Sequence, residues 1–160
     1  MPKFEEFNLS PSSEVKEIEF NGIKIEVKQY LPVETKAGVV NLSVRGALVN
    51  GTIDEVLSSA YFHMFLIENY TNISFDEGEV SDILENFDKI FTSGLLDAII
   101  DAIPREEYNY LLDTVNVFKD QVIAYSASFA SAMSNTSEIA QLMATTSAPK
   151  PSTRSRKKTN

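Results

Sequence analysis

Residues 83–112 most constrain what this chain can fold into, because they form an apolar helical pattern that is broken twice, at Ser93-Gly94 and at Pro104. Between the two breaks the apolar residues follow the spacing of a wide helix stripe: Leu95, Leu96, Ile99, Ile100 and Ile103. Asp97 and Asp101 lie one turn apart and make the opposite face acidic. A helix this short and this apolar must be buried, so the pattern predicts a bundle packed around it.

Residues 15–30 alternate apolar and charged side chains with a period of two, on either side of Asn21-Gly22. Asn-Gly favours the positive φ angles of a type I′ turn, so the segment is predicted to be a β-hairpin. Ile23, Ile25 and Val27 would share one face of its second strand. A two-stranded hairpin is marginal in water, so this face must cover helices or join another sheet. Its edge can also receive a strand from a partner, and we assign these three residues to a predicted partner-binding surface.

Helical patterns fill the rest of the chain up to about residue 145. One helix is expected to start at Pro32 and stop at Asn50-Gly51, and Thr52 with Glu55 then resembles a capping box for a second helix over 53–70. This second helix is apolar on almost every face. Further helices are expected over 79–91, within 95–103 and from Pro104, where Glu106 and Glu107 suit the positive first turn. From Ser126 the last helix weakens and fits better against a partner than alone.

These patterns predict an α+β, mainly α-helical protein with an N-terminal β-hairpin followed by a bundle of about five helices. Residues 1–13 are expected to form an extended arm, and residues 14–145 a single globular domain with the hairpin at 15–30 and helices over 32–145. Residues 146–160 are expected to form a flexible basic tail. A length of 160 residues fits one domain of this kind.

Charge is spread unevenly between the body and the tail. The tail has no acidic residue and contains Lys150, Arg154, Arg156, Lys157 and Lys158. Residues 1–145 hold the remaining nine basic residues against all 23 acidic ones, a net charge of −14. Such a body should repel nucleic acid and anionic membranes, whereas the tail could touch either one, or an acidic patch on its own or a neighbouring subunit. We add the five tail residues, with Asp97 and Asp101, to the predicted partner-binding surface.

Few residues suggest catalysis, a metal or a cofactor. The chain has no cysteine, so disulfides and thiolate chemistry are excluded. The single histidine, His63, lies in an apolar helix and is interpreted as a core or interface residue. Asp97 and Asp101 could form a metal or acid/base pair, but a solvated or partner-facing surface is favoured. Gly-rich phosphate loops and Gly-x-Ser-x-Gly elbows are missing. We expect no catalytic, cofactor-binding or metal-binding residues, and no enzyme.

Three segments carry a resemblance to a known family. They are Lys28-Gln29-Tyr30-Leu31-Pro32 with the residues up to Lys36, the loop Tyr70-Thr71-Asn72-Ile73-Ser74-Phe75, and residues 99–110, IIDAIPREEYNY. Taken in this order, the chain resembles a family of small tailed-bacteriophage proteins encoded among virion-morphogenesis genes, over about residues 15–125. The resemblance implies a tail-assembly-chaperone-like protein or a structural protein of the head, neck or tail, and no catalytic residues.

Two hypotheses of different class follow. The first is a non-enzymatic virion structural or morphogenesis protein, whose partners are other phage structural proteins or further copies of itself. The second is an acidic intracellular inhibitor that blocks a host nucleic-acid-binding protein by charge mimicry. Neither needs a membrane, and nucleic acid would be met only through the basic tail. The N-terminus has no basic and apolar leader pattern, so the expected location is the virion or the cytoplasm of the infected bacterial host, not secretion.

Overall fold

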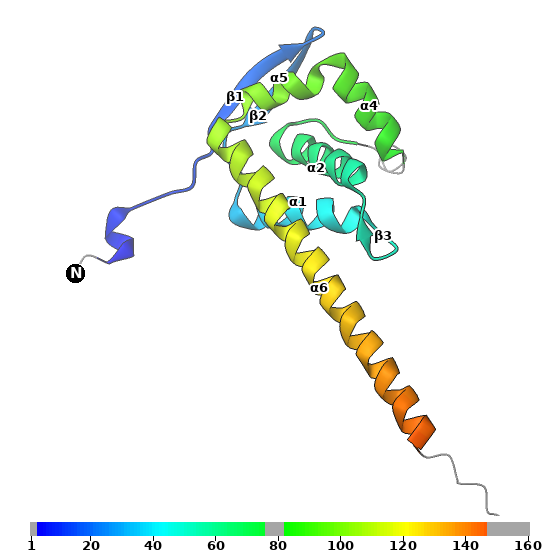
Figure 1. The fold of residues 1–160 in the computed structure, drawn as a ribbon. Coiled ribbons are helices and arrows are strands. Elements are labelled where there is room, and N and C mark those ends of the chain that lie inside the picture. The colour runs from blue at the N-terminus through cyan, green and yellow to red at the C-terminus, as the bar shows by residue number, and fades with distance from the viewer. Residues whose placement is uncertain (1–2, 76–81, 147–160) are drawn as a thin grey trace, which may run out of the picture. The chain divides into compact units, whose positions relative to one another are not determined.

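The computed structural model describes residues 3–75 and 82–146 (Figure 1). The chain divides into two compact units, Met1–Ile123 and Ala124–Asn160, so the boundary falls inside the predicted domain 14–145. The predicted basic tail, with Lys150, Arg154, Arg156, Lys157 and Lys158, lies outside the described residues. The predicted arm is exposed wherever its side chains are described, and it contains one short 3-10 helix, Phe4–Phe7.

The N-terminal hairpin is present as predicted. Strands β1 (Val15–Phe20) and β2 (Ile23–Lys28) pair antiparallel, with Ile18 opposite Ile25. Asn21 and Gly22 have φ angles of 51° and 78°, as a type I′ turn requires. One face of the hairpin packs on the helices, which supplies the burial that a lone hairpin lacks.

The expected long first helix is shorter than predicted, because a second hairpin follows it. Helix α1 (Val33–Gly46) ends four residues before Asn50. The two-residue strands β3 (Leu48–Val49) and β4 (Thr52–Ile53) then pair around Asn50-Gly51, whose φ angles of 52° and 81° match those of the first turn. Thr52 is therefore in a strand and does not cap a helix. Helix α2 (Glu55–Tyr70) is capped by Asp54, whose side chain accepts a hydrogen bond from the Leu57 N–H at 2.9 Å.

Three further helices follow α2 in the described residues. Helix α4 (Ile83–Ser93) ends at Gly94, whose φ of 79° is the left-handed conformation that the Ser93-Gly94 break predicts. Helix α5 (Leu95–Ala102) carries the apolar stripe, and Leu96 and Ile99 are buried. Helix α6 (Arg105–Thr146) begins directly after Pro104 and crosses the boundary between the two units.

The hydrophobic core of the first unit is built around α2, which lies between α1 on one side and α4 and α5 on the other (Figure 1). Phe62, Leu66 and Ile67 of α2 are almost completely buried, which explains why this helix is apolar on nearly every face. The predicted class, α+β and mainly helical with an N-terminal hairpin, is confirmed. Within the described residues, no helix combines the length and the apolar character that crossing a membrane requires.

Candidate interaction site beside the Glu107 network

Glu107, in the first turn of α6, is the centre of a buried polar network. Its carboxylate lies 2.7 Å from the Lys36 Nζ and accepts a hydrogen bond from the Tyr70 hydroxyl at 2.9 Å. The backbone N–H of Leu31 donates to the same carboxylate at 3.1 Å. These groups come from α1, α2 and the segment after β2, so one side chain joins four parts of the first unit. Hydrogen bonds and charge pairing are what make burial of this carboxylate tolerable.

The same contacts set the protonation states in the network. Burial raises the pKa of the Glu107 carboxyl, but hydrogen bonds from Lys36, from the Leu31 N–H and from Tyr70 outweigh burial and hold that pKa below its ordinary value. Burial, and then the neighbouring Glu107, raise the pKa of Tyr70 well above its usual range. The Lys36 ammonium also lies 4.1 Å from the centre of the Tyr30 ring. At neutral pH Glu107 is therefore a carboxylate and Tyr70 a neutral phenol.

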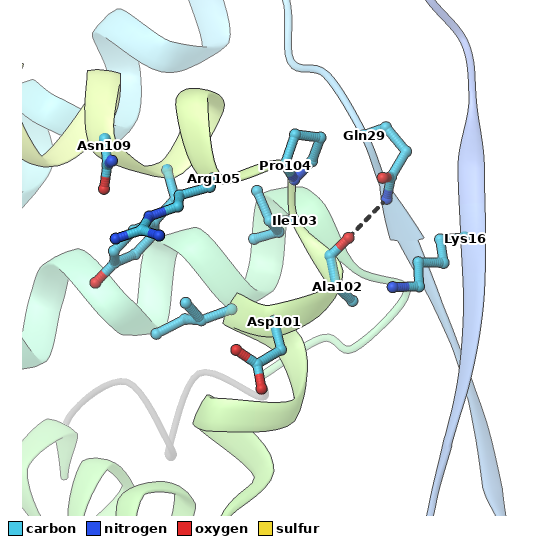
Figure 2. A pocket seen from close by; sticks show the side chains of 10 residues that line it. Lys16, Gln29, Asp101, Ala102, Ile103, Pro104, Arg105 and Asn109 are labelled. Atoms are coloured by element: carbon cyan, nitrogen blue, oxygen red, sulfur yellow. Dashed lines mark hydrogen bonds between the residues drawn. The ribbon is translucent and has the colours of Figure 1, made fainter.

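An open groove of about 740 Å³ lies between the hairpin, the end of α5 and the start of α6, and its lining includes Gln29 and Tyr108, which adjoin the network residues Tyr30 and Glu107 in the sequence. Figure 2 shows its charged and polar lining, which includes Lys16 of β1, Asp101 of α5 and Arg105 of α6. Gln29 fixes the hairpin to α5 at the groove, because its amide donates to the Ala102 carbonyl oxygen at 3.0 Å. Among the described salt bridges none joins Lys16, Asp101 and Arg105 to one another. The groove thus presents both signs of charge.

The structure separates the residues predicted to bind a partner. Asp97 and Asp101 are both exposed on α5, but only Asp101 lines the groove. Ile23 is 67% exposed and available for contact. The assignment of Ile25 and Val27 to a partner surface is wrong for this fold, because they are 3% and 0% exposed and belong to the core. The alternation correctly predicted that the three side chains share one face. The protein's own helices cover this face at Ile25 and Val27 but not at Ile23.

The outer edge of β2 is also partly occupied. Val27 forms an isolated antiparallel bridge with Thr71, and the Asn72 side chain accepts a hydrogen bond from the Glu26 N–H at 3.1 Å. In the described sheet β1 pairs only with β2, so the other edge of β1 has no strand beside it.

His63 is held by its neighbours in a neutral form. Its Nδ1 lies 2.8 Å from the backbone oxygen of Ser59, which can only accept, so Nδ1 carries the proton. Nε2 then accepts from the Tyr108 hydroxyl at 3.2 Å. Burial lowers the pKa of His63. Both ring nitrogens are occupied by structural contacts, in keeping with the interpretation of His63 as a packing residue. Within the described part of the chain, no cluster of three or more His, Asp or Glu side chains could hold a metal ion.

Four residues that line the groove were not singled out from the sequence: Lys16, Gln29, Arg105 and Asn109. Lys16 is one of several charged residues on the outer face of a hairpin, and Arg105 is one of several polar residues at a helix start. The sequence gives only an indirect indication that these four residues belong to a site. Gln29, Arg105 and Asn109 lie within the segments from which a family resemblance was predicted, whereas Lys16 lies outside them.

Comparisons of the chain with protein-family models, with curated proteins and with solved structures found no match.

Proposed function

We propose that this protein is a non-enzymatic virion structural or morphogenesis protein of a tailed bacteriophage, which acts through protein–protein contacts in assembly of the head, neck or tail. Its site of action would be the virion or the cytoplasm of the infected bacterial host, and its partners other phage structural proteins. The proposal begins from the resemblance of residues 28–36, 70–75 and 99–110 to proteins encoded among morphogenesis genes.

The observation that carries the proposal is that these three segments meet at one place. Leu31 and Lys36 of the first segment and Tyr70 of the second all bind Glu107 of the third. Every residue that lines the groove, except Lys16, belongs to the first or the third segment. The resemblance therefore coincides with one buried network and the groove beside it. A resemblance confined to scattered core positions would not gather in this way.

The composition of the groove favours a polypeptide as the ligand. Lys16, Asp101 and Arg105 present both signs of charge, and the partly buried Ile100 adds apolar contact surface. A peptide segment with an apolar anchor and flanking charged residues would match all of these features, as it does at many protein interfaces. The acidic outer face of α5, with Asp97 and Asp101, lies next to the groove and would steer a basic partner toward it.

Mass spectrometry of purified virions beside infected-cell lysate tests the biological role. A copy number that matches a ring or the capsid lattice would support a virion component. Abundance in lysate with absence from virions would leave an assembly chaperone or the acidic inhibitor. Capture by the tape-measure protein or another structural protein would then support the chaperone, and capture only by a host nucleic-acid-binding protein would contradict the proposal.

A matched pair of variants tests the groove itself. Asp101→Lys reverses a charge that lines the groove, and Asp97→Lys reverses an equally exposed charge one turn away that does not line it. We expect Asp101→Lys to reduce co-purification with the partner at least several-fold and Asp97→Lys to leave it nearly unchanged. Equal loss in both variants would assign the contact to the acidic face of α5 in general, and equal retention would exclude Asp101 from it.

A further inference from the structure

Helix α6 has a regular repeat of apolar residues that continues beyond the first unit. Leu111, Val115, Phe118 and Val122 are separated by four, three and four positions. The same spacing continues with Tyr125 and Phe129, at three and four positions, and with Met133 at four more. Alternating steps of three and four place side chains along one seam of a helix, as in helices that pack along one another. One pattern thus spans two parts of the helix.

In the first unit this seam is an established packing surface. Leu111 and Val115 are 0% and 3% exposed, and both belong to the hydrophobic core. Phe118 and Val122 are partly buried against the same core. The repeat therefore has a clear purpose up to residue 122, which is to bury one side of α6 against the helices of its own unit.

In the second unit the same seam has no cover among the described residues. Tyr125, Phe129 and Met133 are 74%, 60% and 58% exposed. Residues 121–146 contain a single charged residue, Glu138, and many serines and alanines. A surface helix without partners is normally rich in charged residues and in pairs of opposite charge, and most of the stability of a helix in a protein comes from the packing of its apolar face. The sequence of this segment is instead typical of a helix that packs against another helix.

Charge indicates which helix fits there. All but one of the acidic residues of the chain precede Gln121, so two copies would repel each other over most of their surface. Residues 121–146, which hold one charged residue, are a long stretch where two copies can meet without this repulsion. A strongly charged partner would find at most the single charge of Glu138 in residues 121–146, whereas the same nearly neutral, apolar segment of another copy matches it.

We propose that the second unit mediates self-association, with Tyr125, Phe129 and Met133 of one copy packed against the α6 helix of a second copy. Small neighbours such as Ser126 and Ala130 allow the two helices to approach closely, and the aromatic side chains supply most of the buried apolar area. The pairing does not depend on the phage assignment. It would give a virion or chaperone protein a route to the multiple copies that assembly uses.

The test measures the mass of the purified full chain in solution by sedimentation equilibrium or by size exclusion with light scattering. We expect wild-type protein to form dimers or larger assemblies below about 100 µM, a range in which specific protein pairs with micromolar Kd associate. The double substitution Tyr125→Glu with Phe129→Glu should weaken association at least tenfold, because it places charges in the seam. Val56→Glu is the control, since Val56 is a 68% exposed apolar residue on α2.

Each result decides the proposal. Association in the wild type and in Val56→Glu that the double variant abolishes supports it, whatever the number of copies. A monomeric wild type, or association that the double variant retains, overturns it. Far-UV circular dichroism and thermal unfolding of the double variant show whether the first unit is still folded, and because all the changed side chains are exposed we expect that it is. The chain has no cysteine, so a single Ser126→Cys variant adds an independent readout. If two copies pair through α6, a short bis-maleimide should cross-link the Ser126→Cys side chains of the two copies. Absence of this cross-link in an associated sample contradicts the pairing.

Discussion

The start of α6 and its continuation after Ile123 share one repeat of apolar residues, but they differ in everything that surrounds it. At the start, Glu107 is bound by three other segments and Leu111 is fully buried. After Ile123, Tyr125 and Phe129 are mostly exposed and the helix carries hardly any charge. The repeat of apolar residues therefore predicts which side of a helix is packed. What this side packs against can be inferred only from the neighbouring charges and contacts. The following predictions test that difference.

The largest effect is expected from Glu107→Gln. The substitution leaves the Lys36 ammonium, whose residue is 7% exposed, without its carboxylate, and breaking a buried pair in this way costs about 3–5 kcal/mol. Denaturant unfolding of the first unit measures the loss. Glu106→Gln is the matched control, because Glu106 is the exposed neighbour in the same turn, and its cost should stay within about 0.5 kcal/mol. Similar losses for both would mean that the network does not hold α6 in place.

The network should also make stability depend on pH. Because the folded state lowers the pKa of Glu107, folding favours the ionised carboxylate, and this part of the stability is complete above the ordinary value of 4.5. It is lost as the pH falls from 4.5 through the lower pKa of the folded state. Thermal unfolding of the wild type and of Glu107→Gln across this range should converge at low pH. A constant difference in melting temperature would show that the Glu107 charge does not contribute.

A third effect concerns a close contact between two helices. A Cβ at Gly46 would lie 2.9 Å from the ring of Tyr61 on α2, whereas a Cβ at Gly38, in the same helix, would meet nothing within 4 Å. Alanine in a helix gains about 0.5–1 kcal/mol over glycine. Gly38→Ala should therefore stabilise the protein. At Gly46→Ala, overpacking against the Tyr61 ring should cost about 1–3 kcal/mol, from which the gain in helix propensity is subtracted. The pair is compared by denaturant unfolding. Changes of the same sign would show that α1 and α2 are not in close contact.

A fourth effect comes from the first hairpin turn. Gly22 has a φ of +78°, which a β-branched side chain adopts only with strain, so Gly22→Val should cost about 1–3 kcal/mol. A Cβ there has nothing within 4 Å, so the loss would arise from the backbone alone. Unchanged thermal unfolding would show that the hairpin contributes little to the stability of the unit.

These positions also show how far sequence alone can predict this fold. The first hairpin was predictable because six-residue strands on each side of Asn21-Gly22 give alternation enough room to appear. The second was missed although Asn50-Gly51 has the same turn geometry, because strands of two residues have no visible period and the preceding residues continue a helical spacing. Asn-Gly thus indicated a turn in both places, but it identified a hairpin only where long alternating strands flank it.

The candidate site was less predictable, because its contacts are distant in sequence. Glu107 was placed correctly in a helix first turn, but Lys36 lies 71 residues away and Leu31 76 residues away, and no local pattern pairs them. The groove itself was not predicted, and of the predicted partner-binding residues only Asp101 lines it. For Ile25 and Val27 the alternation identified the shared face correctly, yet which elements cover a face depends on tertiary packing, which periodicity does not encode.

The smallest effect is expected where the two parts of α6 differ most. Phe129→Ser, at protein concentrations low enough for a single copy, should change the unfolding free energy of the first unit by no more than about 0.5 kcal/mol, because the ring is 60% exposed. Leu111→Ala, on the same seam but fully buried, should cost about 2–5 kcal/mol at the same dilution. At high concentration the Phe129 variant should lose stability relative to the wild type, since association stabilises the folded state by mass action. A large loss already at low concentration would mean that Phe129 is covered within its own chain, and the contrast between the two parts of the helix would then be false.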